Sequence, residues 1–560
     1  MTGAREHDLP PDVDTPVVIA GAGPVGMALA LELAMHRVKS VLVERNPETT
    51  TFPKMDLTNV RSMELMRRWG TLDDIRRAGV GEQYSFDVIF TSGLDGYEYG
   101  RWELPSQKEM RDTITAANDG SQPREPWQRI SQERMEAVLM KRCLDSPFID
   151  VRRPWAVVAV RQEADGAVTT IRSANGDEHQ LRSTFVAGCD GAHSVVRRST
   201  NIHLEGERSA LGTSCQVHFR SRDVRTLHRF GQFWHIFMAR PIGRVVIVAQ
   251  DEEDTWTMQA SVPAGTTVDE IDPVEFLRLH TNSAIEVDEI LKHSVWQPQA
   301  LVASSYRDRQ IFVAGDAAHQ YIPTGGYGMN TGVGDAVDLG WKLAAVINGW
   351  GGERLLDSYD AERRPVGVAN RDRAVHNARV HSDAAQIVGA DAHLLAQDND
   401  AGEKLRARLT AHYADRRGEN ESFGTELGYG YPDSPVITTA ADEDEIGTIT
   451  AADPLVYTPT ACPGARAPHV FLSPDNSIID NFTDQFTLVN FGGDPRAVKD
   501  ILAAAGDLGV PMKHVAIDHQ SARELYRRDF AIVRPDGHVA WRSSHRPDSP
   551  ADLVATVAGR

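Results

Sequence analysis

The chain has 560 residues, enough for two to four domains, and its 41% hydrophobic and 25% charged residues are typical of a globular protein. Its net charge of −20 argues against nucleic acid or an anionic membrane surface as a partner. The cysteines are scattered, without a CxxC pair or metal-ligand spacing, so we expect a reducing, cytoplasmic location and no metal site. The polar, proline-rich first residues predict no signal peptide, and the longest apolar stretch, residues 16–31, is too short and too broken by glycines for a membrane span.

A glycine-rich turn lies near the N-terminus, in the segment VVIAGAGPVGMALALELA. Residues 17–20 predict a buried strand and residues 25–35 a helix. In this setting Gly21 makes the tight turn, Gly23 lets backbone N–H groups approach a pyrophosphate, and Gly26 permits close packing of helix on strand. The segment therefore predicts a dinucleotide site, with a merely structural turn as the alternative. The residues expected at the cofactor are Gly21, Gly23, Pro24, Val25 and Gly26.

The next predicted strand, residues 40–45, ends in an acidic and a basic residue. The Glu44 carboxylate is placed to accept hydrogen bonds from a ribose 2′-hydroxyl, which would also exclude a 2′-phosphate. Arg45 beside it could cover the adenine or its phosphates. Strand, helix and strand together predict a βαβ unit.

A second motif, GCDGAHSVVRRS, follows another buried strand. Asp190 lies in a glycine turn with Arg197 nearby, where the carboxylate could contact both a pyrophosphate and a reductant. The alternative is a surface turn in which Asp190 caps a helix.

Two later segments differ in residue pattern from the predicted βαβ unit. Short alternating segments from about 205 to 300 predict an antiparallel sheet, and polar, acidic residues from 384 to 450 predict a helical connector and a loop. The expected domains are a discontinuous cofactor-binding domain (14–85, 120–200 and 300–383), a sheet domain (86–119 and 201–299), the connector with its loop (384–454) and a small C-terminal α/β domain (455–560).

A third motif, GDAAHQYIPTGGYGMNTGVGDA, begins at the end of an apolar strand with Gly315 and Asp316. Asp316 could bind a hydroxyl of a ribityl chain. A helix then opens, and its positive N-terminus suits the negative charge of a reduced flavin. Because NAD has no ribityl chain, the two glycine clusters together favour FAD. The helix residues expected at the flavin are Gly328, Met329 and Asn330.

Together the three motifs resemble those of the aromatic-ring FAD monooxygenases, the single-component flavoprotein hydroxylases, over about residues 14–380. The segments GARAPHVFL and RDFAIVRPDGHVAWR resemble the C-terminal domain of the phenol hydroxylase and 2,4-dichlorophenol 6-monooxygenase branch. The implied α/β fold has a Rossmann-like FAD-binding domain, an inserted antiparallel-sheet substrate domain and a thioredoxin-like C-terminal domain. This last domain lacks CxxC, so we expect packing and contacts in a homodimer or other homo-oligomer rather than dithiol chemistry.

The resemblance also implies a reaction. NADPH or NADH reduces FAD, O2 then forms a flavin C4a-hydroperoxide, and one oxygen atom hydroxylates a phenolic or related small aromatic substrate. Epoxidation, Baeyer–Villiger insertion or oxidative loss of a ring substituent are alternatives that use the same flavin chemistry. A non-enzymatic binding scaffold with a flavin fold is an alternative of another class.

Three site residues come from the resemblance. Lys54 stands where the family commonly has an arginine that contacts the flavin, and Gln132 matches a glutamine that contacts FAD. Asp56 matches a carboxylate near the substrate hydroxyl, where it could act as a base on the phenolic proton. Alternatively, Asp56 or Thr58 caps the following helix.

The substrate is expected between the flavin and the antiparallel sheet. Because side chains alternate along a strand, core packing is an equal explanation for any single candidate there. His319 is expected to be structural, and Asp338 stands where the family usually has asparagine and is expected to face helix packing. The candidates for lining the substrate are His218, Trp234, His235, Met238 and Pro323.

Overall fold

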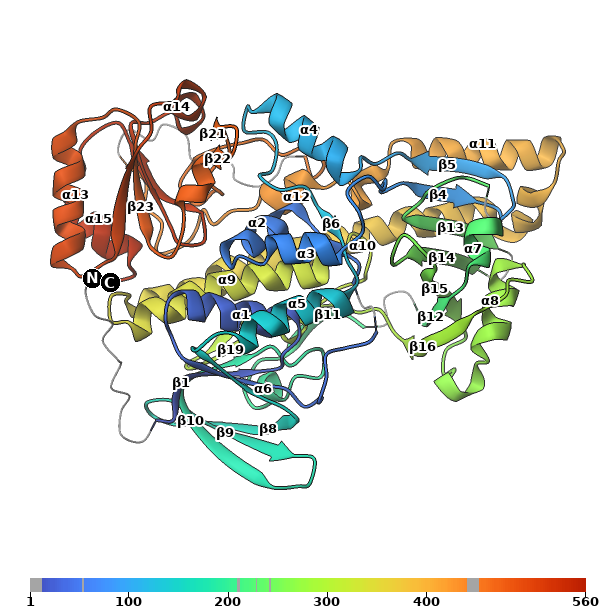
Figure 1. Cartoon of the computed structure of the whole chain (residues 1–560), viewed down its shortest axis with the longest axis horizontal. Coiled ribbons are helices and arrows are strands. Elements are labelled where there is room, and N and C mark those ends of the chain that lie inside the picture. The colour runs from blue at the N-terminus through green and yellow to red at the C-terminus, as the bar shows by residue number, and fades with distance from the viewer. Residues whose placement is uncertain (1–12, 53–54, 209–211, 228, 241–242, 441–452) are drawn as a thin grey trace.

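The structure is a computed structural model that describes residues 13–52, 55–208, 212–227, 229–240, 243–440 and 453–560. The chain has a mixed α/β fold in three parts, and Figure 1 shows the central part between a sheet at one end and a smaller domain at the other. Within the described ranges, no helix combines the length and the apolar character needed to cross a membrane.

A mostly parallel sheet forms the core of the central part. Its strands run in the order β18 (Arg307–Asp308), β19 (Ile311–Val313), β10 (Glu178–Gly188), β1 (Thr15–Ala20), β2 (Ser40–Val43) and β7 (Ile149–Arg152). The pairs from β19 to β7 are parallel, while β8 (Trp155–Gln162) and β9 (Ala167–Ser173) extend β10 as antiparallel strands. All six residues of β1 are buried, as expected for a strand covered on both faces.

Three helices pack on one another over this sheet. α1 (Pro24–Met35) follows β1 and lies against α5 (Gln132–Leu144) and α9 (Tyr327–Ile347). α9 is buried along most of its length because it also meets the C-terminal domain, where Trp341 packs with Phe486. The other elements of the central part are α2 (Val60–Arg68), α3 (Leu72–Ala78), α6 (Val195–Arg198) and the short strands β3 (Leu57–Thr58), β6 (Gln128–Arg129), β11 (Leu204–Glu207), β17 (Ala300–Ala303) and β20 (His319–Gln320).

The second sheet has seven strands in the order β16 (Glu289–Trp296), β12 (Thr213–Arg220), β15 (Thr255–Val262), β14 (Gly243–Ala249), β13 (His235–Arg240), β4 (Val88–Thr91) and β5 (Glu98–Trp102). β13 and β4 run parallel, which corrects the expectation of a wholly antiparallel sheet. Alternation along β13 turns Phe237 toward α10 (Glu353–Val388), on the inner face. Ile236 and Met238 point to the outer face, against α8 (Pro273–Thr281). This alternation decides which side chains can line a site on the inner face.

The 36-residue helix α10 runs from the central part to the second sheet (Figure 1). α11 (Asp400–Ala414) then packs along β5, and α12 (Phe423–Leu427) contacts α2. These helices occupy much of the segment expected as a connector and loop. Residues 441–452 of that segment lie outside the described residues.

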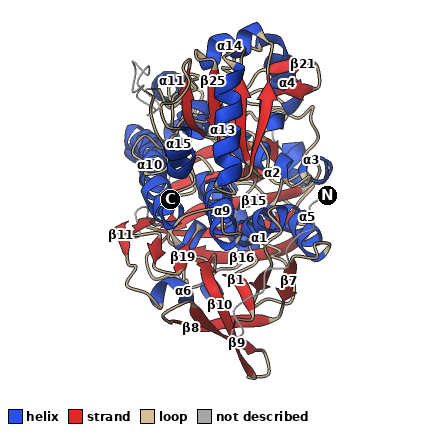
Figure 2. Ribbon diagram, turned by 90° about the vertical axis from the view of Figure 1, so that its left-hand side faces the viewer, coloured by secondary structure: helices blue, strands red, loops and turns tan. Residues whose placement is uncertain are grey.

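The C-terminal domain is built on the four-stranded sheet β24 (Met512–Ala516), β23 (Phe486–Asn490), β25 (Phe530–Val533) and β26 (Val539–Ser543). β23 and β24 are parallel and the other pairs are antiparallel, a thioredoxin-like arrangement. Figure 2 shows α13 (Pro495–Asp507) in front of this sheet, and α15 (Pro550–Val557) packs against α13.

A cluster of buried charges joins α9 and α10 to the C-terminal domain. Arg534 donates hydrogen bonds to Glu362 at 2.7 and 2.8 Å and to Asp338 at 2.9 Å. It also donates to Asp536 beside it in the chain. Lys342 donates to Asp338 at 2.7 Å and to Glu362 at 2.6 Å. Asp338 therefore faces the packing of α9 on α10, as expected, and its side chain also accepts a hydrogen bond from Arg534 of the C-terminal domain.

The charges of this cluster balance when one carboxylate holds a proton. Burial raises the pKa of Asp338 well above its usual range, and the neighbouring Glu362 carboxylate adds to this effect, against the opposing charges of Lys342 and Arg534. With a proton on Asp338, two carboxylates face two cations. The oxygens of Asp338, Glu362 and Asp536 lie within 4.8 Å of one another, a spacing that could suit a metal ion, but the two cationic side chains already neutralise them.

Candidate functional site

The glycines of the first loop have different roles. Gly21 has a φ of +96°, and a Cβ there would lie 2.4 Å from the Cys189 carbonyl oxygen. A Cβ on Gly26 would lie 1.9 Å from the Gly21 oxygen. The protein's own packing therefore requires both glycines. Gly23 is different, because a Cβ built on it meets nothing within 4 Å.

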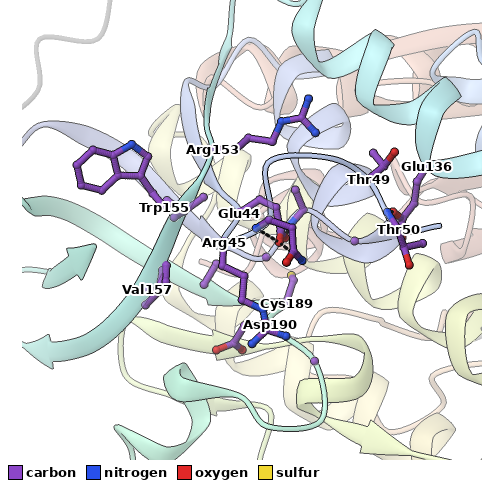
Figure 3. Close-up of a pocket in the computed structure, with 18 of the residues that line it drawn as sticks. Glu44, Arg45, Thr49, Thr50, Glu136, Arg153, Trp155, Val157, Cys189 and Asp190 are labelled. Carbon is purple, nitrogen blue, oxygen red and sulfur yellow. Dashed lines mark hydrogen bonds between the residues drawn. The ribbon is translucent and has the colours of Figure 1, made fainter. Parts of the chain in front are cut away.

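A cavity of about 270 Å³ lies in front of this loop, at the carboxyl ends of β1, β2 and β10 (Figure 3). The first two motifs meet there, since residues of both contribute to its wall. Parallel sheets commonly bind ligands at this edge, beside the N-terminus of a helix. The lining residues include Gly21, Gly23, Glu44, Arg45, Thr50, Gln132, Glu136, Arg153, Trp155, Cys189 and Asp190.

Glu44 is fixed at the mouth of the glycine loop. Its Oε2 accepts a hydrogen bond from the Ala22 N–H at 2.9 Å, and its Oε1 accepts from the Asn46 N–H at 2.8 Å. Arg45 follows it on the cavity wall (Figure 3). The carboxylate therefore both orders the loop and faces the cavity.

Asp190 caps the short helix α6 with one of its carboxylate oxygens. Its Oδ2 accepts hydrogen bonds from the N–H groups of Val195 at 2.6 Å and Val196 at 3.1 Å, at the start of α6. Its Oδ1 is buried at the cavity and has no hydrogen-bond partner among the described residues. The structure thus shows the helix-capping alternative, and the contact of Asp190 with a pyrophosphate stays a prediction. Arg197 instead donates to the Ala317 carbonyl at 2.7 Å, so it ties the second motif to the third.

The third motif packs directly on the first. Gly315 has a φ of +59°, and a Cβ there would lie 2.9 Å from Val25 Cγ2. A Cβ on Gly332 of α9 would lie 2.5 Å from the same atom. Asp316 lies beside this contact and is exposed. His319 is buried, with its Nε2 2.8 Å from Asp335 Oδ2, as a structural residue would be.

The N-terminus of α9 is held by an asparagine. The Asn330 amide donates to the carbonyls of Leu57 at 3.0 Å and Gly326 at 2.7 Å, and its oxygen accepts from the Asn59 N–H at 3.0 Å. The Asn330 side chain is therefore used by the protein, which leaves the backbone N–H groups of this turn for a cofactor. Met329 is half-buried, and a Cβ on Gly328 would meet nothing within 4 Å.

Gln132 begins α5 on the cavity wall. Its amide donates to Glu136 Oε1 at 2.7 Å, and Glu136 Oε2 accepts from the Thr50 N–H at 3.0 Å. Lys54, the other residue expected at the flavin, lies outside the described residues. Glu136, Thr50 and Arg153 also line the cavity, and no sequence motif indicated them. Glu136 and Thr50 lie within six residues of Gln132 and Glu44 in the chain, whereas Arg153 is near neither.

Asp56 is brought to the second sheet by the ribbon of β3 and β6. The Trp234 indole N–H donates to Asp56 Oδ2 at 2.6 Å, and His235 Nε2 lies 3.6 Å from the same oxygen. α2 is capped instead by Asn59, whose side chain accepts from the Ser62 N–H at 2.9 Å. The alternative that Asp56 or Thr58 caps this helix is therefore wrong.

The electrostatic surroundings keep Asp56 ionised. Burial alone would raise the pKa of Asp56, but the hydrogen bond and charge of His235 and the Trp234 N–H outweigh it and hold the pKa below its usual value. At neutral pH the group is thus a carboxylate that can accept a proton. Its side chain is 22% exposed, so it is not sealed within the core.

The other substrate candidates fall in different places. His218 is on the inner face of the second sheet, with Nδ1 3.2 Å from Thr257 Oγ1, and burial lowers its pKa to about 4. Met238 packs on the outer face with Ile236, so the structure does not bring it to Asp56. Pro323 is exposed in the turn before α9.

Two residues of the inner face had no sequence signal. His381 of α10 stacks on Phe237 with ring centroids 4.6 Å apart, and its Nε2 lies 2.5 Å from Glu419 Oε2. Both are polar side chains buried in a mostly aromatic wall. They lie 38 residues apart in a segment without a motif, so only folding reveals the pair.

Comparison with known proteins places these features in a family. Residues 14–374 match the family described as "FAD binding domain", and residues 460–560 match "Aromatic-ring hydroxylase, C-terminal". The chain is 38% identical to the FAD-dependent monooxygenase apdD of Emericella nidulans, over 99% of this chain and 92% of that relative.

A second relative and a solved structure are also similar to this chain. The 2,4-dichlorophenol 6-monooxygenase of Cupriavidus pinatubonensis is 29% identical, over 98% of this chain and 96% of the relative. The crystal structure of the flavin-dependent monooxygenase PieE in complex with FAD and substrate has a TM-score of 0.86 at 26% identity, and the match covers 98% of this chain and 99% of that one.

Proposed function

Because this chain belongs to the FAD-dependent aromatic-ring monooxygenases, we propose that it hydroxylates a phenolic or related aromatic compound, with NADH or NADPH as electron donor and O2 as co-substrate. The observation that carries the proposal is the ionised Asp56 carboxylate, held by Trp234 and His235. Asp56 is next in the chain to Leu57, whose carbonyl accepts a hydrogen bond from the Asn330 amide in the first turn of α9.

The residues of the chain fit FAD at both ends. At the first loop, Gly23 has open space where a Cβ would be, and Asp190 Oδ1 is a buried acceptor without a partner among the described residues. In this proposal Glu44 binds the hydroxyls of the ribose and Asp316 binds a hydroxyl of the ribityl chain. The backbone N–H groups around Gly328 would bind the polar edge of the flavin ring.

The chain's own contribution to the reaction is proton removal. When bound and reduced, FAD supplies the activation of O2 for transfer of one oxygen atom to an aromatic ring. Asp56 accepts the proton of the substrate hydroxyl, which makes the ring more electron-rich and more nucleophilic. The Trp234 N–H keeps the Asp56 carboxylate in place and lowers its affinity for the proton at rest. The proposed site therefore includes Trp234 and His235, whereas Met238 is left out.

A panel of phenols tests the proposed function. Oxidation of NADH and NADPH by the FAD-loaded protein is followed with each phenol, and hydroxylated product and H2O2 are measured in the same reactions. We expect at least one phenol to stimulate oxidation, with product equal to the nicotinamide consumed. If no phenol stimulates oxidation and all electrons go to H2O2, the assignment to phenol hydroxylation is wrong.

Substitution of Gly23 by valine tests the cofactor cradle. Since a Cβ there meets nothing in the protein, Gly23→Val is expected to fold normally and to bind FAD at least about tenfold more weakly, because its side chain takes the place of the pyrophosphate. Quenching of FAD fluorescence on binding gives the affinity. Gly506→Val is the matched control, because Gly506 also has open space but lies in α13. Unchanged FAD affinity in Gly23→Val would contradict the cradle.

A further inference from the structure

The inner face of the second sheet has a polar group at each side of one phenylalanine. His235, which contacts Asp56, meets the Phe237 ring edge-on with centroids 5.9 Å apart. His381, from α10, stacks on the same ring at 4.6 Å. Phe90 packs beside them, 5.5 Å from Phe237. Two polar ends are thus joined by an aromatic wall.

His381 has one ring nitrogen that the protein does not use. The side chain is almost fully buried, and Nε2 is engaged by Glu419. Nδ1 is also buried, and it has no hydrogen-bond partner among the described residues. Buried polar atoms are nearly always paired, so an unpaired one in a wall of a candidate site points to a ligand.

The pair with Glu419 determines which kind of partner Nδ1 can take. Burial lowers the pKa of His381, so the ring is neutral at neutral pH. Burial would raise the pKa of Glu419, but the hydrogen bond of His381 and the charge of Arg244 oppose it and the pKa lies below its usual value, so the Glu419 carboxylate can only accept a hydrogen bond. Nε2 must then carry the proton, which leaves a lone pair on Nδ1. A ligand at Nδ1 is therefore a hydrogen-bond donor.

A cation lies over the same phenylalanine ring as His381. The Arg244 guanidinium lies over the Phe237 ring, 5.8 Å from its centroid. Arg244 makes no ion pair or hydrogen bond with any described residue, and burial lowers its pKa. Its N–H groups are free to donate, and its charge acts on both His381 and Glu419. A hydroxyl can donate to Nδ1 and accept from Arg244 at once.

We propose that His381 and Arg244 bind a second polar group of the substrate, a hydroxyl or a ring N–H remote from the hydroxyl that faces Asp56. This inference rests on the proposed function and narrows its substrate class to aromatic compounds of more than one ring with polar groups at both ends. The apolar rings lie against Phe237, between the two polar ends. Glu419 is a positioning residue, because it acts only by orienting His381.

Two biaryl probes test the proposed contact with His381 and Arg244 by binding alone. 4-Phenylphenol and 4,4′-dihydroxybiphenyl differ only in the remote hydroxyl, and each is titrated into the FAD-loaded protein without nicotinamide while the flavin absorbance is followed. The parent protein is expected to bind the dihydroxy probe about tenfold more tightly, as one hydrogen bond to a buried partner allows. His381→Phe keeps an aromatic ring and is expected to lose this preference while binding 4-phenylphenol as before.

His280→Phe is the matched control, because His280 is also buried and packs on a phenylalanine, Phe276, but belongs to α8 on the outer face. It is expected to keep the preference. Glu419→Gln, which no longer fixes the proton on Nε2, is expected to reduce it. Equal affinity of the parent for both probes, no binding of either, or an unchanged preference in His381→Phe would overturn the proposal. The phenol panel judges the proposed function separately, since no turnover enters the binding assay.

Discussion

Asp56→Asn is expected to lower kcat by about 100-fold or more with the phenol that best stimulates the enzyme, because an amide cannot accept the phenolic proton and general-base catalysis typically contributes about 10²–10⁴-fold. FAD content is expected to stay at the level of the parent, since Asp56 contacts Trp234 and His235 and does not line the cofactor cavity. Stopped-flow measurement of hydroxylation in single turnover gives the rate without interference from product release.

The control for this prediction is another aspartate-to-asparagine change. Asp272 caps α8 on the outer face of the sheet, and asparagine is an equally good cap, so Asp272→Asn is expected to retain activity. A kcat close to that of the parent in Asp56→Asn would show that the carboxylate is not the base.

Substitution of Trp234 is expected to shift the pH dependence of the reaction. Trp234→Phe removes an N–H that holds the pKa of Asp56 down, so this pKa should rise. Because the base works only when ionised, the acid limb of kcat/KM is expected to move to higher pH in this variant. An acid limb at the same pH would mean that another group limits the reaction.

Arg534→Met is expected to lower the free energy of unfolding by about 3–5 kcal/mol, because it leaves buried carboxylates without their cation. Arg534 lies 5.1 Å from the ring centroid of Trp341, so tryptophan fluorescence during urea unfolding reports on this interface. Adding Asp536→Asn removes one of the orphaned charges and is expected to recover part of the loss.

An exposed arginine of the same domain provides the comparison. Arg496 forms its ion pair with Asp494 at the surface, with its side chain 84% exposed, so Arg496→Met is expected to leave the unfolding curve unchanged. If Arg534→Met were as stable as Arg496→Met, the buried cluster would not be what holds the C-terminal domain to α9.

Much of the candidate cofactor site could be proposed from the sequence because its signals are local. A glycine turn between a strand and a helix is contained in a few consecutive residues, and steric limits on φ and on Cβ packing act over the same distance. Gly21 and Gly26 illustrate this, since their neighbours are the turn itself and the next parallel strand. The order of three such motifs along the chain was enough to indicate FAD and the family.

Other residues were predicted less well because their partners lie far away in sequence. Whether Asp56 caps a helix or faces a substrate depended on Trp234, which is 178 residues later. Met238 could not be separated from its neighbours until the pairing of β13 showed which face each side chain takes. A one-residue change of register would have reversed the answer.

By itself the sequence determined the local elements of this protein: the glycine turn between strand and helix, the FAD cofactor and the family. These follow from steric and hydrogen-bonding demands between near neighbours in the chain. Only the tertiary structure decided the buried charge cluster around Arg534 and the pairing of His381 with Glu419. Their pKa values and their contribution to stability depend on burial and on charges from distant segments. These surroundings form only when the chain has folded.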